Sequence, residues 1–107
     1  MAGESSILAQ SNPSSSTLTD ILTVAGIPVE VDDIIITNQG TTAAAVRLAI
    51  TPTGAAIAAG QYILYDHVLG PGRTLHEDFK RPLRLPVGAI VRGFADSASV
   101  SFNVIGA

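Results

Sequence analysis

The residue types best suited to chemistry are the two histidines, His67 and His76. Asp78 follows His76 by two positions, so in a strand both side chains point to one face. An imidazole and a carboxylate are ligands that zinc accepts, but two ligands do not complete a site. The sequence supplies no clear third ligand, and we predict no metal. We interpret the His76 to Asp78 stretch as a polar strand that pairs with Arg73 or Lys80.

A second candidate is the carboxylate cluster Glu30, Asp32 and Asp33. Alternation along a strand puts Glu30 and Asp32 on one face, where two carboxylates could act as acid and base or bind calcium. Such residues more often solvate the outer face of a strand, and we interpret them in that way. No Gly-x-Ser-x-Gly elbow, Gly-rich phosphate loop or cysteine is present. We therefore predict no catalytic residue, no enzyme activity and no cofactor.

The composition describes one domain of 107 residues with little charge. The charged fraction is 14%, about half the usual share for a soluble domain. Part of the exterior is then either covered by a partner or made of small neutral residues. A net charge of -3 argues against a nucleic-acid partner, since phosphates need a basic face.

No apolar run approaches the roughly 20 residues that span a bilayer, so we predict no membrane partner. The first residues, Met1 to Glu4, lack the basic and apolar regions of a secretory signal. We expect a protein made in the cytoplasm, where the absence of cysteine also fits.

The elements that must position these side chains are β-strands. Runs rich in Val, Ile, Thr and Tyr fall at residues 17–24, 29–37, 44–50, 62–68, 73–79, 80–85, 89–95 and 99–105. The clearest alternation is in residues 44–50, where Val46 and Leu48 face the core and Arg47 faces away. Turns are predicted at 38–40 and 69–72, and a loop of small residues at 55–60. Pro82 excludes a central strand position.

About eight short antiparallel strands without a convincing helix predict an all-β chain folded as a single jelly-roll-like β-sandwich. We place this domain at residues 17–107. Residues 1–16 are rich in serine and are predicted to form an extended N-terminal arm.

Two surface patterns add expectations. Five basic residues lie in the C-terminal half and five acidic ones in the first, namely Arg73, Lys80, Arg81, Arg84 and Arg92 against Glu4, Asp20, Glu30, Asp32 and Asp33. Either the domain has a positive and a negative side, or the charges are spread around it. Tyr62 and Tyr65 are three positions apart, which predicts opposite faces.

Several segments together resemble small virion proteins of tailed bacteriophages. They are Ile34 to Gly40, Ala45 to Ile50, Gly54 to Ala56, Tyr62 to Asp66, and Ser99 to Phe102. Those proteins carry a similar series of features in the same order. The series is a hydrophobic strand ending in Asn-x-Gly, an arginine-bearing strand, a Gly-Ala-Ala loop, a Tyr-rich strand ending in Asp, and a closing Ser-x-Phe strand.

The resemblance implies a capsid cement (decoration) protein on the virion. Such a protein binds the outer surface of the shell formed by the major capsid protein and stabilises it, and is expected to be a homo-oligomer, with a trimer as the working guess. The contacts expected are the arm, through Ile7 and Leu8, and the basic side, through Arg73, Arg81 and Arg84. Two alternatives stay open: a module of the tail, baseplate or fibre, and a cytosolic β-sandwich that binds other proteins.

Overall fold

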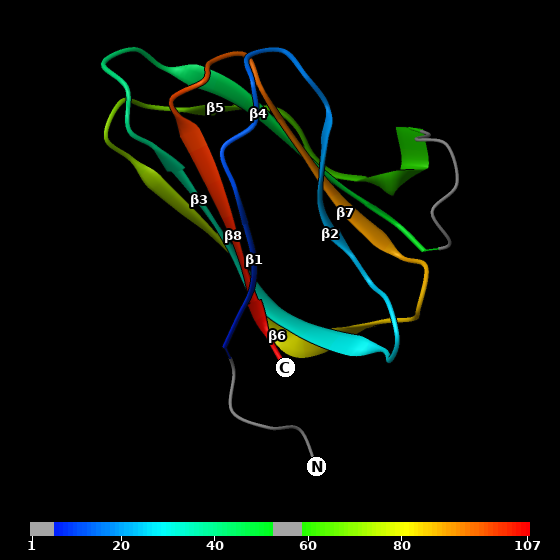
Figure 1. Ribbon diagram of the computed structural model, residues 1–107. Helices are drawn as coiled ribbons and strands as arrows, with labels where there is room; N and C mark the ends of the chain where they lie inside the picture. Colours follow the sequence, from blue (N-terminus) through cyan, green and yellow to red (C-terminus); the bar gives the residue numbers. More distant parts are fainter. Residues whose placement is uncertain (1–5, 53–58) are drawn as a thin grey trace.

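The computed structural model describes residues 6–52 and 59–107, which form two four-stranded antiparallel sheets packed face to face (Figure 1). The strands of the described residues are β1 (Ser6–Ser11), β2 (Thr19–Thr23), β3 (Val29–Asn38), β4 (Ala44–Thr51), β5 (Tyr62–Leu69), β6 (Thr74–Leu85), β7 (Ile90–Ala95) and β8 (Val100–Gly106). A 3-10 turn, η1 (Ala59–Gln61), precedes β5. The all-β prediction is confirmed.

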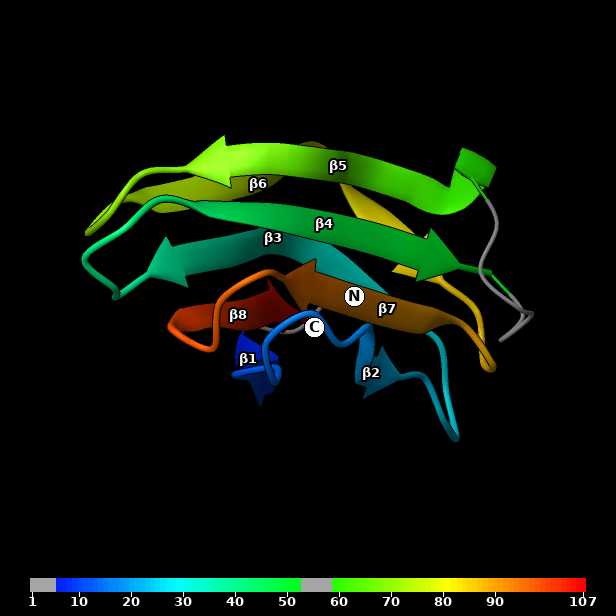
Figure 2. The same ribbon diagram turned by 90° about the horizontal axis from the view of Figure 1, so that it is seen from above.

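The strand order identifies the sandwich as a jelly roll. One sheet has the order β1-β8-β3-β6 and the other β2-β7-β4-β5. Except for the β4–β5 hairpin, every connection therefore crosses from one sheet to the other, as in double-sheet jelly rolls. Figure 2 shows how strands of the two sheets face one another, with β4 beside β3 and β7 beside β8.

The core lies between the sheets and is built by alternation. Val46 and Leu48 of β4 are fully buried, as predicted, while Arg47 lies on the outer face. The largest fully buried side chain is Phe102 of β8. Full burial of one large aliphatic or aromatic side chain stabilises a fold by about 1.5–3 kcal/mol. Other fully buried side chains are Val31, Ile34, Ile36, Val91, Val100 and Val104.

The buried Asn38 stabilises one end of the sandwich through hydrogen bonds of its side chain. It is the first residue of a turn that the sequence predicts. Its amide donates to the carbonyls of Thr42 and Leu69, at 2.9 and 3.0 Å. Its Oδ1 accepts a hydrogen bond from the backbone N–H of Gly40. The predicted turn is confirmed, and the other predicted turn contains Gly72, with a φ of 69°. Most of the loop predicted at 55–60 lies outside the described residues.

The predicted arm over residues 1–16 needs correction for its described part, since residues 1–5 lie outside the described ranges. Residues 6–11 are extended, but they pair with β8 as the edge strand β1, in the register Ser6↔Gly106 to Ser11↔Phe102. Leu8 packs against the core, and the Asn12 amide donates to the carbonyls of Ala98 and Val100. The segment therefore belongs to the sandwich. The strand was not predicted because the segment is rich in serine and has few apolar residues to bury.

The predicted strands at 73–79 and 80–85 are one long strand, β6. It pairs with β3 in two stretches, from Thr74 to Asp78 and from Leu83 to Leu85, and the β6 residues between them, 79–82, lie opposite the single β3 residue Asp32. Pro82 falls in this interruption. Because β6 is an edge strand, the missing N–H of proline removes no hydrogen bond from the centre of the sheet. The total of eight strands was thus right, although β1 was missed and β6 was divided.

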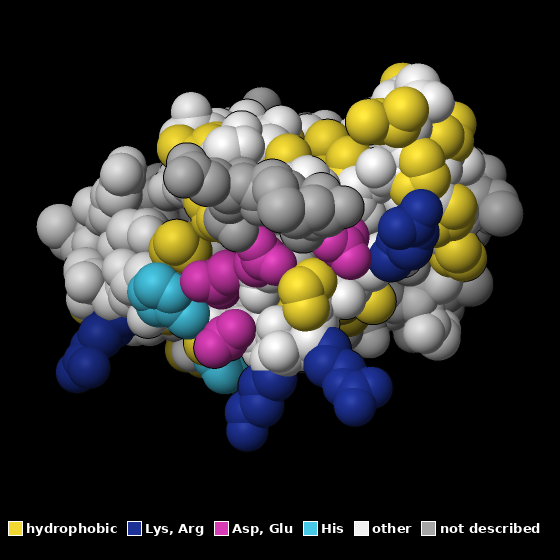
Figure 3. Space-filling model, turned by 90° about the horizontal axis from the view of Figure 1, so that it is seen from below, with side chains coloured by type: hydrophobic (Ala, Val, Ile, Leu, Met, Phe, Trp, Pro, Cys, Tyr) yellow, Lys and Arg dark blue, Asp and Glu magenta, His cyan; other side chains and the backbone are white. Residues whose placement is uncertain are grey.

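Of the two alternatives for the charges, a separate positive and negative side does not describe the molecule. The acidic first half of the chain pairs with the basic second half within the sheets: Glu30 lies opposite Arg84, and Asp20 lies 3.0 Å from Arg92. Figure 3 accordingly shows acidic and basic side chains on the same face. Glu4 lies outside the described residues. The other alternative, charges spread around the sandwich, describes the molecule better.

Candidate protein interface

The histidines do not build a site together. His76 Nδ1 lies 3.2 Å from Asp33 Oδ2, so its partner is on β3 and is neither Arg73 nor Lys80. The β3–β6 register explains this, because Asp33 lies opposite Asp78, the neighbour of His76 on the outer face. Within residues 6–52 and 59–107, no group of three or more His, Asp or Glu side chains could hold a metal ion.

The carboxylates of β3 do not keep the predicted alternation. A bulge between Val31 and Asp33 interrupts the pairing with both neighbouring strands, and Asp32 lies inside it. The extra residue changes the parity of the strand, so Asp33 rather than Asp32 continues on the outer row with Ile35. The prediction that Glu30 and Asp32 share a face assumed regular alternation, and the bulge at Asp32 interrupts that alternation.

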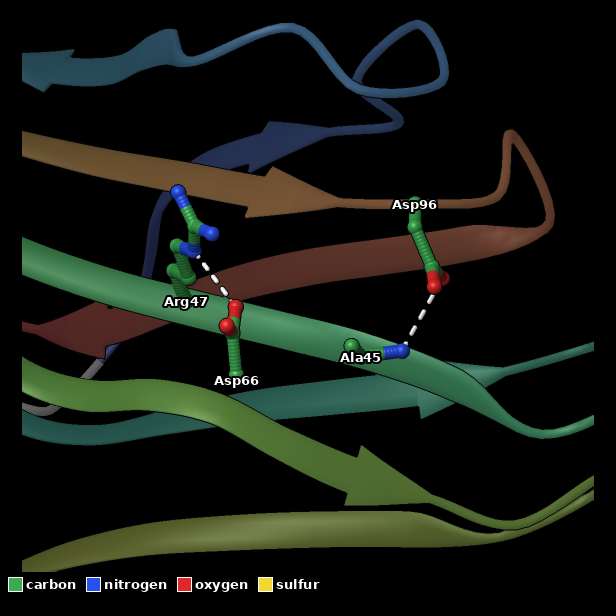
Figure 4. A network of polar contacts seen from close by, with 4 residues as sticks. All are labelled: Ala45, Arg47, Asp66 and Asp96. Atoms are coloured by element: carbon green, nitrogen blue, oxygen red, sulfur yellow. Dashed lines mark hydrogen bonds and ion pairs between the residues drawn. The ribbon is translucent and has the colours of Figure 1, made fainter.

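A different group is gathered on the outer face of the sheet β2-β7-β4-β5. The guanidinium carbon of Arg47 lies 4.3 Å from the centre of the Tyr65 ring and 4.5 Å from that of Phe94. Its Nε donates a hydrogen bond of 2.6 Å to Asp66 Oδ1 (Figure 4). We call Arg47, Tyr62, Tyr65, Asp66 and Phe94 the Arg47 cluster. Two aromatic faces and one carboxylate fix the direction of this guanidinium.

Two bulges in β5 bring the cluster together and overturn the prediction for the tyrosines. The β4–β5 register shifts between Val46 and Leu48 and again between Leu48 and Ala49. Each shift leaves an additional residue in β5. Tyr62 and Tyr65 consequently lie on the same side, in an edge-to-face contact with ring centroids 5.0 Å apart. Asp66, in the first bulge, has a φ of 52°, which is uncommon for a residue with a side chain.

Arg47 is held in its protonated, positively charged form. The hydrogen bond to Asp66 raises the pKa of the guanidinium above its ordinary value, with a further contribution from the negative charge of the same carboxylate. Arg47 is 26% exposed, so the cluster is accessible from solvent. It is an anchored cation that contacts two aromatic rings.

A second arginine lies on the same face. Arg92 of β7 is diagonal to Arg47 in the β4–β7 register, and its Nε lies 3.0 Å from Asp20 Oδ1 without the alignment of a hydrogen bond. Between the arginines lies the small and fully buried Ala49. Both arginines therefore have a carboxylate near Nε.

Next to the cluster, β5 exposes apolar surface along a free sheet edge. Ile63, Tyr65 and Val68 are 39%, 60% and 68% exposed. A second exposed pair, Ile27 and Val87, occupies the neighbouring β2–β3 and β6–β7 loops, which are linked by hydrogen bonds between Val24, Gly88 and Ala89. Exposed apolar side chains in contiguous groups mark interaction sites more often than isolated ones do.

The predicted contact residues do not form one patch. Ile7 is exposed, whereas Leu8 is partly buried against the core. Arg73, Arg81 and Arg84 are all exposed, but Arg73 lies in the β5–β6 turn and Arg84 near the far end of β6. Alternation did place Arg47 on the outer face. The alternation pattern did not predict the bulges in β5 that bring aromatic rings to this residue.

Comparison with known proteins adds no relative, since no family model, no curated protein and no solved structure matches this chain. Over the part that the structure describes, no helix is long and apolar enough to cross a membrane.

Proposed function

We propose that this protein is a non-enzymatic capsid cement protein, which binds the outer surface of a bacteriophage shell and stabilises it. The observation that carries the proposal is the exposed row Ile63, Tyr65 and Val68 on β5, contiguous with the Arg47 cluster. Tyrosine and arginine surrounded by apolar side chains are typical of the centres of protein interfaces. The resemblance to small virion proteins and the low charge of the chain point the same way.

The sheet edges favour docking through side chains over the addition of a strand from the partner. β1, β2 and β5 each carry a bulge, and β6 carries Pro82 and an interrupted register. Such irregularities are the usual protection of an edge against pairing with another chain. We therefore place the contact on the outer face of β2-β7-β4-β5 and the side chains of β5.

The stabilisation would be energetic rather than chemical. A protein that binds the assembled lattice and not the free subunits shifts the equilibrium toward the assembled shell by mass action. A stable contact of this kind buries roughly 800 Å² on each partner. Many copies bound to one shell add further stability, because each bound copy contributes its own binding free energy to the assembled lattice.

The first experiment is to count the copies of this chain per purified particle by quantitative mass spectrometry, relative to the major capsid protein. A number close to stoichiometric with the shell would support the cement role. A handful of copies would favour the alternative, a module of the tail or baseplate, while absence from particles would leave a cytosolic binding module.

A pair of double variants then tests the surface. Ile63→Ser with Val68→Ser should lower occupancy on shells stripped of the protein by about tenfold or more, as expected for the loss of central contacts. Ile27→Ser with Val87→Ser is the matched control, since it removes similar exposed apolar surface from the loops. If only the control lost occupancy, the interface would lie at the loop end and the assignment to β5 would be wrong.

A further inference from the structure

The outer face of β2-β7-β4-β5 carries an ordered pattern of charge. Taken across the sheet, the charged side chains are Asp20 on β2, Arg92 on β7, Arg47 on β4 and Asp66 on β5. The signs are negative, positive, positive, negative. This set of four is thus cationic in its middle and anionic at its rims, although its charges sum to zero.

This pattern disfavours a second copy of the same face as the partner. A two-fold axis through the centre of this set, in the plane of the interface and along the strands, would set Arg47 against Arg92 and Asp20 against Asp66. Like charges placed together in an interface are strongly unfavourable. The surface complementary to the whole set has an anionic centre and a neutral or cationic rim, which a second copy centred on this face does not offer.

The hydrogen bonding of Arg47 indicates which anion fits. The Asp66 carboxylate accepts from Nε, so the two terminal nitrogens carry donors directed away from Asp66 (Figure 4). Two parallel donors at the end of a planar guanidinium match the two oxygens of a carboxylate. The contacts with the Tyr65 and Phe94 rings restrict the guanidinium, which lowers the entropy lost when a ligand binds.

We propose that Arg47 is the specificity-determining anchor of this face and that it binds an aspartate or glutamate side chain of the partner protein. The flanking Asp20 and Asp66 would repel a dianionic phosphate more strongly than a single carboxylate. The identity of the partner as a capsid protein rests on the proposed function, whereas the chemistry of the anchor does not.

The test uses acetate as a minimal probe, with inorganic phosphate for comparison and chloride to keep the ionic strength constant. NMR signals of the arginine side-chain N–H groups are followed during each titration. We expect acetate to shift the Arg47 and Tyr65 signals saturably. Arg47→Lys, which retains the charge but loses the planar fork, should weaken this binding by about tenfold or more. Arg81→Lys, on exposed β6, is the matched control and should change nothing.

Equal shifts at Arg47 and Arg81, or tighter binding of phosphate than of acetate, would overturn the proposal. Occupancy on shells separates the two proposals. If the wild-type protein fails to bind shells but acetate still binds at Arg47, the cement role fails and the carboxylate anchor stands. If the wild-type protein and Arg47→Lys bind shells equally well, the anchor fails and the cement role stands.

Discussion

The side-chain amide of Asn38 donates a 3.0 Å hydrogen bond to the carbonyl of Leu69, which joins the end of β3 in one sheet to the end of β5 in the other. The same amide also binds the carbonyl of Thr42, and its Oδ1 accepts from Gly40. Asn38 is fully buried, so these bonds replace the water that the amide loses. One polar side chain thereby holds the β3–β4 connection and the last residues of β3 and β5 together.

Asn38→Asp should be strongly destabilising. The substitution keeps the shape but removes both donors and buries a carboxylate against two carbonyl oxygens. We expect the free energy of unfolding to fall by about 2–4 kcal/mol, measured by urea denaturation. Asn103→Asp is the control, since Asn103 accepts from Gln10 through Oδ1 near the surface, and a carboxylate accepts as well. Equal losses in the two variants would show that Asn38 has no special role.

Three glycines should respond to alanine in a fixed order. A Cβ at Gly106 would collide with the backbone oxygen of Glu30, which cannot move without breaking the pairing of β3 with β8. At Gly93 it would meet the flexible end of Ile21 at 2.6 Å and the Phe102 ring at 3.1 Å. At Gly60 it would meet nothing within 4 Å.

We expect Gly93→Ala to cost about 1–3 kcal/mol, the usual range for overpacking. Gly106→Ala should cost more than that or prevent folding, and Gly60→Ala should be close to neutral. Thermal denaturation followed by circular dichroism measures all three. A stable Gly106→Ala variant would mean that β3 and β8 separate more easily than this geometry implies.

Asp66 should tolerate asparagine and reject valine. Its φ of 52° suits asparagine better than most residues, and the amide oxygen introduced by Asp66→Asn would still accept from Arg47. A β-branched residue in this conformation adds about 1–2 kcal/mol of backbone strain. Asp66→Asn should therefore retain the wild-type melting temperature within a few degrees, and Asp66→Val should melt lower. Equal melting temperatures for both would show that the bulge relaxes readily.

Glu77 should protect the edge of β6. Its register partner is the buried Ile34, so Glu77 belongs to the inward row at the rim of the sandwich. A charge pointing inward on an edge strand discourages the addition of another chain. Glu77→Val should increase the light scattering of concentrated solutions over days. Asp78→Val, on the outward row, is the control, and a larger effect there would locate the protection elsewhere.

Much of the fold could be predicted from local alternation. Val46, Leu48 and Arg47 revealed the two faces of β4, and the turn residues marked most strand ends. β1 was missed because the Ser-rich segment buries only Leu8 and Ala9 in part, which makes the pattern too weak. β6 was divided between Phe79 and Lys80, although both parts belong to one edge strand, which tolerates Pro82.

The candidate interface was mostly beyond reach from sequence, for a physical reason. A single bulge reverses the face of every later residue in a strand, and nothing in Tyr62 to Asp66 announces one. Alternation therefore put the two tyrosines on opposite faces. Which strands become neighbours depends on contacts between distant parts of the chain, so the pairing of Glu30 with Arg84 was also not visible.

The central place of β8 has a consequence for synthesis. β8 lies between β1 and β3, although residues 100–106 leave the ribosome after all the other strands. Until then β1 has no neighbour to pair with, one edge of β3 is unpaired, and the core lacks Phe102 and Val104. The nascent chain therefore exposes unpaired strand edges and part of its apolar core until β8 is made. Growth at lower temperature or with abundant chaperones should improve the yield of soluble protein.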